Sequence, residues 1–433
     1  MWTDENAASA ALFDRARAVL PGGSTRAAVW LDPYPPYVAR GEGAYVYDVD
    51  GTEYLDLTNN LGVLIHGHAH PEVVAAVREQ AGMGSCFALP TGSEVDLAEL
   101  ICGRVEGFER IRFINTGSEA VGLALKIARS FTGRTKIVKL EGVYHGSNDF
   151  AEISNYSTPE NWGNTPAAVP TVRGTPEGVL DSVLVIPAND LGAAEALLKE
   201  QADDVAAVLL DPVPPRAGMQ PLAADFVAGL RSLTRSLGIL LIFDEVIAFR
   251  FGYGGAQTRF GGEPDLTALG KIIGGGYPVG AVAGSAEVME ATARDVGSSG
   301  TFTANPVTMR AGHASMRLLT PECFTGLDEL GARMMKEANQ LLAEAGVVGQ
   351  VCGTGSIASV YFHDRDVRDY RSYFKQPEEA AASNAFHLAM LKRGVLIAPT
   401  ATCFFSTAVS TADEDRFLSA FRDSLQDVRA AAA

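Results

Sequence analysis

One lysine of this chain stands out because its surroundings favour chemistry over solvation. Lys271, one of eight lysines, lies in Leu269-Gly-Lys-Ile-Ile-Gly-Gly-Gly276, between small and apolar residues. Removal from water lowers the pKa of a lysine, and its neutral amine is then a nucleophile for an aldehyde. A lysine that reaches solvent beside a glycine turn is the alternative. Lys271 is therefore the first candidate for a catalytic residue.

A candidate anion site follows the predicted strand Ile111–Asn115. Thr116, Gly117 and Ser118 come directly before a predicted helix. Glycine lets backbone N–H groups approach an anion, and a helix N-terminus favours negative charge, so this segment suits a phosphate group. The alternative is an ordinary helix cap with Ser118 at the N-cap position.

Two further strand ends carry side chains that suit a flat, cationic ring. Asp244 ends the apolar run Ile239–Phe243, where a carboxylate is poorly solvated unless a cation pairs with it. A protonated pyridine nitrogen is one such cation, and its charge makes the ring an electron sink. An arginine or a helix cap is the alternative. Tyr144 could stack on a ring face, or Tyr144 and His145 could be ordinary packed side chains.

The predicted elements bring these candidates to one edge of a sheet. A helix is predicted at Ala8–Val19 and a hairpin at 44–56. Apolar runs then alternate with helical stretches, which indicates parallel strands covered on both faces, with ligands bound beyond their carboxyl ends. The predicted strands are Ile111–Asn115, Lys136–Leu140, Val183–Ile186, Val205–Asp211 and Ile239–Phe243, and the predicted helices are Glu119–Phe131, Ala193–Gln201 and Ala224–Ser236.

The fold class is therefore α/β, and the length of 433 residues favours more than one domain. We expect an N-terminal segment (1–65), a large domain (66–301) and a mostly helical C-terminal domain (302–433) with one or two short strands, at Ile357–Phe362 and Val395–Ala398. The loop Gly146–Asp181 is long for a compact domain, and such loops are usually functional or mobile.

Composition excludes several classes of function. The net charge of −17 argues against binding to nucleic acid or to anionic membrane surfaces. Five scattered cysteines form no paired metal motif and fit a reducing cytoplasm. The acidic N-terminus lacks the features of a signal peptide, and no apolar stretch is long enough to span a bilayer.

Taken together, the motifs resemble those of the class III aminotransferases among the fold-type-I enzymes that use pyridoxal 5′-phosphate (PLP). The most similar branch contains glutamate-1-semialdehyde aminomutases and β-amino-acid aminotransferases. The resemblance extends from Pro21 to about Asp415. It rests on Asn115-Thr-Gly-Ser-Glu-Ala120, Tyr144-His-Gly146, Phe243-Asp-Glu-Val246, Leu269-Gly-Lys271 with Gly274-Gly-Gly276, and Gly300-Thr-Phe302 with Asn305-Pro306.

The resemblance implies a role for each matching residue. Lys271 holds PLP as a Schiff base and moves protons on the substrate. Asp244 pairs with the ring nitrogen, while Val246 and Tyr144 contact opposite ring faces. The remaining cofactor residues are Gly117 and Ser118, whose backbone holds the phosphate, and Thr301, which reaches the phosphate in the neighbouring subunit of an obligate homodimer. The implied fold is a seven-stranded, mostly parallel large domain with a small α+β domain built from both chain ends.

The substrate is less certain than the cofactor. Arg26 matches a carboxylate-binding arginine of this branch, and the arginine fork fits a carboxylate. Thr400 replaces an arginine that β-amino-acid aminotransferases use for a second carboxylate, and Arg250 could take over that role. The aminomutases place a glutamate near Cys403, and it is absent here. Asp211-Pro212 stands where many relatives have Glu-Pro.

These observations leave several functions open. The leading hypothesis is an aminotransferase that moves an amino group between an amino acid, of the α or the β type, and a keto acid or aldehyde. The second is a 2,1-aminomutase, which must retain its diamino intermediate, so that a lid such as the long loop would favour it. An epimerase with His145 as a second proton carrier and a non-catalytic PLP-binding protein are weaker alternatives. We expect no resident metal.

Overall fold

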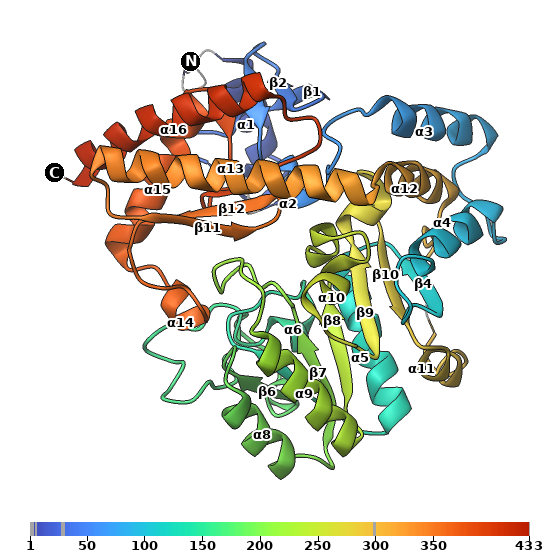
Figure 1. Ribbon diagram of the computed structural model, residues 1–433. Helices are drawn as coiled ribbons and strands as arrows, with labels where there is room; N and C mark the ends of the chain where they lie inside the picture. The colour runs from blue at the N-terminus through green and yellow to red at the C-terminus, as the bar shows by residue number, and fades with distance from the viewer. Residues whose placement is uncertain (1–3, 5–6, 27–30, 298–299, 433) are drawn as a thin grey trace. The chain divides into compact units, whose positions relative to one another are not determined.

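The computed structural model describes residues 4, 7–26, 31–297 and 300–432. The chain forms two compact units (Figure 1). Residues 72–325 and 365–374 form the first, called here the sheet unit. Residues 1–71, 326–364 and 375–433 form the second, called the terminal unit because it contains both chain ends.

A seven-stranded sheet forms the centre of the sheet unit. Its strand order is β4-β10-β9-β8-β7-β5-β6. β10 runs antiparallel to both of its neighbours, and all other neighbouring pairs are parallel, which confirms the prediction of a mostly parallel sheet. The strands are β4 (Arg110–Ile114), β5 (Lys136–Leu140), β6 (Val183–Ile186), β7 (Val205–Leu210), β8 (Leu240–Asp244), β9 (Leu266–Gly270) and β10 (Gly280–Gly284).

Helices cover both faces of this sheet because its strands are apolar on both sides. Ile137 packs with helix α5 (Gly117–Thr132) on one face. Its neighbour Val138 packs with α8 (Leu191–Glu200) and α9 (Ala224–Leu237) on the other face (Figure 1). Since successive strand residues point to opposite faces, an unbroken apolar run is what such a strand requires.

Strands β9 and β10 were not among the predicted elements. The sequence of β10, Gly-Ala-Val-Ala-Gly, is poor in the branched and aromatic residues that favour strands. The structure explains its small residues, because a Cβ at Gly280 would lie 2.0 Å from the backbone oxygen of Thr116. The close approach of β10 to the start of α5 therefore requires glycine.

The other helices of the sheet unit connect the strands or lie at its periphery. They are α3 (Pro71–Met83), α4 (Gly92–Cys102), α6 (Asp149–Glu152), α7 (Glu177–Leu180), η3 (Ala248–Phe251), α10 (Gly255–Phe260), η4 (Lys271–Gly274), α11 (Ala286–Ala291), α12 (Pro306–Leu318), the start of α13 (Pro321–Ala345) and α14 (Tyr370–Tyr373). The long loop after β5 contains α6 and α7, which the sequence did not predict.

The terminal unit has an α+β architecture with two small sheets around one apolar core. One sheet contains β1 (Val38–Glu42), β2 (Tyr45–Asp48), β3 (Glu53–Asp56) and β13 (Val395–Leu396), and the other contains β11 (Gln350–Thr354), β12 (Ile357–Tyr361) and β14 (Thr402–Phe404). The helices are α1 (Ala8–Arg17), η1 (Pro21–Gly23), α2 (Asn59–Gly62), α15 (Pro377–Lys392), α16 (Thr411–Ala432) and most of α13. The C-terminal part thus has more strands than expected, because β11 and β14 lack a clear alternating pattern.

The unit boundaries differ from the expected domain boundaries at 65/66 and 301/302. They lie at 71/72 and 325/326, and residues 365–374 belong to the sheet unit. Residues 302–325 belong to the sheet unit because α12 packs on α4 and η4. Tyr370 holds residues 365–374 against the sheet unit because its ring packs directly on Gly142. A Cβ at Gly142 would lie 1.9 Å from that ring.

Within the described ranges, no helix combines the length and apolar character needed to cross a membrane. The same residues contain no cluster of three or more His, Cys, Asp or Glu side chains suited to a metal ion.

Candidate active site

Lys271 directly follows strand β9, at the carboxyl end of that strand, and is the first residue of the short helix η4. Its backbone has a φ of +49°, a conformation that costs a non-glycine residue on the order of 1 kcal/mol or more and that is concentrated at functional sites. Burial lowers the pKa of its amine, helped by the positive charge of Arg250 and opposed by Asp244 and Asp211. The surroundings therefore favour the neutral, nucleophilic form.

Asp244 ends the neighbouring strand β8 and is almost fully buried. One of its oxygens, Oδ2, lies 2.8 Å from Nδ1 of His145. The other, Oδ1, accepts the backbone N–H of Val246 at 3.0 Å. Burial lowers the pKa of His145, with a smaller contribution from the charge of Lys139, while Asp244 opposes the shift. A neutral His145 that donates from Nδ1 fixes the orientation of the Asp244 carboxylate.

Two more buried acids lie close to Asp244. Asp211 follows β7, and burial together with the charge of Asp244 raises its pKa well above the ordinary value. Glu245 accepts the backbone N–H groups of Ala256 and Gln257, each at 2.8 Å, and burial raises its pKa to about 7. The surroundings of Asp244 thus favour protons on both adjacent acids, Asp211 and Glu245.

The predicted phosphate site is a tight cradle at the start of α5. Thr116, and not Ser118, is the N-cap, since its hydroxyl accepts the N–H of Glu119 at 3.1 Å. Ser118 instead accepts the N–H of Ser147 through its side chain at 3.1 Å. A Cβ at Gly117 would lie 2.7 Å from Val246 Cγ1. The space beside the first turn of this helix therefore tolerates no side chain at 117.

Side chains for the two faces of a ring are present at this cradle. Val246 lies close to Gly117, and a Cβ at Gly270 would also approach it, at 3.2 Å. Tyr144 is 49% exposed. A buried acid, a partly buried amine and a glycine cradle at adjoining strand ends fit a flat, phosphate-bearing aldehyde such as PLP.

Thr301 lies beside the same cradle in its own chain. Its backbone oxygen accepts Cys86 Sγ at 3.3 Å. The hydroxyl of Thr303 lies 3.5 Å from Asn115 Nδ2 at the end of β4. Asn305 caps α12 by accepting the N–H of Thr308 at 2.9 Å. Thr301 itself is exposed.

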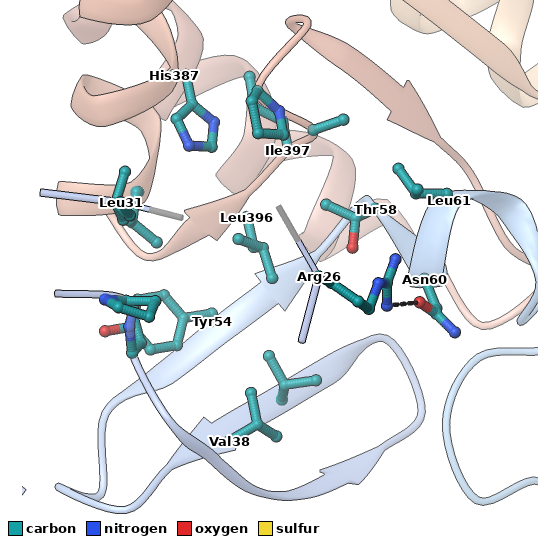
Figure 2. A pocket seen from close by; sticks show the side chains of 16 residues that line it. Arg26, Leu31, Val38, Tyr54, Thr58, Asn60, Leu61, His387, Leu396 and Ile397 are labelled. Atoms are coloured by element: carbon teal, nitrogen blue, oxygen red, sulfur yellow. Dashed lines mark hydrogen bonds between the residues drawn. The ribbon is translucent and has the colours of Figure 1, made fainter. Parts of the chain in front are cut away.

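The two arginines assigned to substrate differ in their environments. Arg26 belongs to the terminal unit, is exposed, and donates from Nη1 to Asn60 Oδ1 at 2.7 Å (Figure 2). Arg250 belongs to the sheet unit and is only 1% exposed, and burial lowers its pKa to about 9. A carboxylate can meet Arg250 only in the interior of the sheet unit.

Thr400 and Cys403 stand at or near the two positions where relatives carry a charged side chain. Thr400 is exposed, and its backbone oxygen lies 3.4 Å from Lys375 Nζ. Burial lowers the pKa of Lys375 to about 8. Cys403 lies in β14 inside the apolar core, where burial raises its pKa to about 12.

Sequence reasoning missed Lys139 as a support of the site. Its side chain is fully buried in β5 and Nζ contacts the backbone oxygens of Val143, Ala151 and Ile153 at 2.6–2.9 Å. Nζ also donates to Asn155 Oδ1 at 2.8 Å. A lysine inside an apolar strand was the available signal. Lys139 fixes the segment that carries Tyr144 and His145.

The fold is that of the PLP-dependent enzymes of fold type I. A match to a family model identifies the class of enzyme within this fold type. The model of aminotransferase class-III matches residues 27–426, and the chain belongs to this family. PLP is the cofactor of this class, and the protein is an enzyme of it.

Individual relatives carry two kinds of name. A glutamate-1-semialdehyde 2,1-aminomutase from Syntrophomonas wolfei subsp. wolfei is 41% identical over 424 residues, covering 96% of this chain and 97% of that protein. An omega-transaminase structure from Sphaerobacter thermophilus is 48% identical, with a TM-score of 0.96 and 99% of each chain covered. A beta-phenylalanine aminotransferase structure from Variovorax paradoxus is 33% identical, with a TM-score of 0.89, covering 99% of this chain and 96% of that one. The names of the curated relatives favour the aminomutase alternative over the leading hypothesis, while the solved structures include transaminases.

Proposed function

We propose that this enzyme transfers an amino group between an amino acid and a separate keto acid or aldehyde. The partly buried Lys271 and the buried Asp244, at the ends of the neighbouring strands β9 and β8, support amino-group chemistry in general. The 48% identity to an omega-transaminase supports transfer between two molecules. A β-amino acid as donor is in keeping with the similarity to a beta-phenylalanine aminotransferase.

The roles of the residues follow from their positions. When bound, PLP supplies a carbonyl that takes up the amino group and a ring that accepts electrons. Lys271 binds the cofactor through its amine and then carries a proton to and from the substrate carbon. Asp244, oriented by His145, holds a proton on the ring nitrogen. Backbone N–H groups of Gly117 and Ser118 bind the phosphate, and Val246 and Tyr144 bound the ring.

The second candidate is a glutamate-1-semialdehyde 2,1-aminomutase. The names and identities of the curated relatives favour it. The absence of an acid at Cys403 counts against it, and the apolar surroundings of that position would make a carboxylate there costly. Both candidates use the same cofactor residues, so the cofactor site does not distinguish them.

The distinguishing experiment is a comparison of half-reactions with full turnover. The purified holoenzyme is mixed with α-amino acids, β-amino acids and glutamate-1-semialdehyde, and the visible absorbance of the cofactor is followed. An aminotransferase converts its cofactor once with the donor and needs a keto acid for further turnover. Repeated conversion of glutamate-1-semialdehyde without any acceptor would assign the aminomutase activity instead.

Substrate carboxylates are proposed to bind Arg26 and Arg250. The exposed guanidinium of Arg26 suits a carboxylate that arrives from solvent. Arg250 is proposed as a second carboxylate partner because a guanidinium fork fits a carboxylate and because its charge lies inside the sheet unit. A comparison of pyruvate with 2-oxoglutarate in Arg250→Ala tests the second assignment, because only the dicarboxylic acid should lose efficiency.

A homodimer with shared sites is part of the same proposal. Thr301 is exposed and lies beside the cradle segment of its own chain, and in the dimer it would reach the cofactor phosphate of the partner. Sedimentation should show a dimer or a multiple of it, with PLP content falling on dilution to monomer. A stable, fully active monomer would contradict shared sites. The five free cysteines support a reducing cytoplasm as the compartment.

A further inference from the structure

Asp211 is a buried acid to which the proposed chemistry gives no role. It directly follows β7 and is only 3% exposed. In the register of β7 with β8, Leu210 lies opposite Phe243, so Asp211 and Asp244 are the next residues on two neighbouring parallel strands. Such strands lie about 4.8 Å apart. The charge of Asp244 therefore acts directly on Asp211, and the two carboxyl groups share one environment.

The two acids differ in the hydrogen bonds that they accept. Asp244 uses both oxygens, because Oδ2 lies 2.8 Å from Nδ1 of His145 and Oδ1 accepts the N–H of Val246 at 3.0 Å. Asp211 accepts one bond, from the N–H of Val213 to Oδ1 at 2.9 Å. Among the residues that the structure describes, nothing donates to Oδ2 of Asp211, and no cation forms an ion pair with it.

Glu141 shows how the same sheet accommodates a buried acid that pairs with a cation. It follows β5, the other neighbour of β7, and is 4% exposed. Arg371 donates from Nε to Oε2 at 2.8 Å and from Nη2 to Oε1 at 3.1 Å. Both oxygens and the charge of Glu141 are thus compensated. Asp211 has a single N–H donor instead, and an ionised carboxylate with so little compensation is costly to bury.

The surrounding charges favour a proton on Asp211 as well. Burial is the main cause that raises its pKa, followed by the charges of Asp244 and Glu245. The N–H of Val213 and the charge of Lys271 oppose this shift. An ionised Asp211 would in turn raise the pKa of Lys271, as Asp244 does. A neutral Asp211 therefore leaves the amine of Lys271 closer to the form that attacks an aldehyde.

We propose that Asp211 carries a proton on Oδ2 and is the neutral partner of Asp244, so that the two acids together present one negative charge to the cofactor. Two carboxyl groups at one site commonly share a single proton in this way. Asp211 is then a positioning residue, which acts through Asp244 and Lys271. The inference rests on the roles that the proposed function gives to these two residues.

Infrared difference spectroscopy of the holoenzyme tests the protonation state directly. At neutral pH, the spectrum of the wild type minus that of Asp211→Asn should contain the carbonyl band of a protonated carboxyl group and no carboxylate bands. Asp149→Asn is the matched control, because Asp149 is exposed on α6 of the same unit, and its difference spectrum should contain carboxylate bands alone. Carboxylate bands in the difference spectrum of Asp211→Asn would overturn the proposal.

A second measurement follows the cofactor. It is the midpoint pH at which the visible absorbance of the bound cofactor changes. If Asp211 is neutral, Asp211→Asn should move this midpoint by less than about 0.3 pH units, because no charge is lost. If Asp211 were ionised, the midpoint should fall by about one unit or more, because a nearby negative charge stabilises a protonated group. Asp244→Asn should produce such a fall and shows that a lost charge is detected.

The outcomes separate this inference from the proposed function. If amino donors convert the cofactor but the Asp211→Asn difference spectrum contains carboxylate bands, the function holds and the inference is wrong. If the carbonyl band is found but Asp244→Asn leaves the midpoint unchanged, Asp211 is protonated and the role proposed for Asp244 is wrong. Loss of folding or of PLP binding in Asp211→Asn would also contradict the inference, because the amide matches a neutral acid in size and charge.

Discussion

The two polar regions of this protein are organised in opposite ways. In the sheet unit, Asp244, Asp211, Glu245 and Lys271 lie at the carboxyl ends of neighbouring strands. Burial raises the pKa values of Asp211 and Glu245 and lowers that of Lys271. In the terminal unit, the exposed side chain of Arg26 lines a mostly apolar cavity. A charge that acts on a reacting bond is buried, because the low dielectric constant of the protein interior strengthens its electrostatic interactions. Charge that must only recognise a ligand can remain in water.

This contrast predicts that substitutions in the buried centre change the chemical step and the stability, whereas substitutions at Arg26 change recognition alone. The following variants test the contrast, from the largest expected effect to the smallest.

Lys271→Ala should have the largest effect. It removes the amine that binds the cofactor covalently and carries the substrate proton, and loss of such a group costs on the order of 10³-fold or more in turnover. Lys126→Ala, at an exposed position of α5, is the control and should be neutral. Steady-state assays with the best donor check this. Near-normal turnover of Lys271→Ala would contradict the central assignment.

Asp244→Asn should slow the chemical step by roughly 10²-fold, because the negative charge that holds a proton on the ring nitrogen is lost. PLP affinity should change less, since the phosphate cradle is intact. Single-turnover absorbance changes give the rate, and Asp149→Asn, an exposed aspartate of α6, is the control. An unchanged single-turnover rate would remove Asp244 from its role.

Glu245 should make stability depend on pH. Its pKa is about 7 in the folded protein against an ordinary value of 4.5, so the folded state binds more protons between these values. The contribution of Glu245 to the free energy of unfolding therefore falls as pH rises from 4.5 through 7, by about 3 kcal/mol. Urea unfolding of wild type and Glu245→Gln at pH 5 and 8 measures the difference.

In that comparison, Glu245→Gln should lose this part of the pH dependence, whatever its effect on absolute stability. Glu106→Gln, an exposed glutamate of the same unit, should keep the wild-type slope. Parallel pH curves for wild type and Glu245→Gln would show that the buried carboxyl does not titrate in this range.

His145→Phe should lower the rate of the half-reaction about tenfold, because a hydrogen bond to a charged carboxylate contributes roughly 1.5–3 kcal/mol. The loss should appear in kcat, with KM little changed, and should shift the pH dependence of the cofactor absorbance. His145→Asn, which keeps a donor, should recover part of the rate. His313→Phe in α12 is the control. If only KM changed, His145 would have a structural role and no effect on the chemical step.

Arg26→Gln should have the smallest effect on the fold. An exposed side chain with one hydrogen bond changes the free energy of unfolding by no more than about 0.5 kcal/mol. KM for carboxylate substrates should rise about tenfold while kcat stays near wild type. Arg15→Gln, exposed in α1, is the control. If every substrate were indifferent to Arg26→Gln, this arginine would not bind carboxylates, and the contrast between the two regions would fail.

Much of the cofactor centre could be predicted from local sequence. The bounds of β5 and β6 match the prediction, because short apolar runs between helices have few other interpretations. Strand ends then identified Asp244 and the Thr116–Ser118 segment, and the apolar surroundings identified Lys271. The structure agrees with these placements, and their roles with the cofactor remain predictions.

The sequence by itself determined the fold class and the residues able to do this chemistry, because periodicity and strand ends are local properties of the chain. Only the tertiary structure decided which groups meet. His145 and Asp244 are 99 residues apart and pair because β5 and β8 lie in one sheet. The cavity at Arg26 forms from both ends of the chain, where 31–38 lie beside 387–399. Contacts between remote segments depend on packing, which no local pattern encodes.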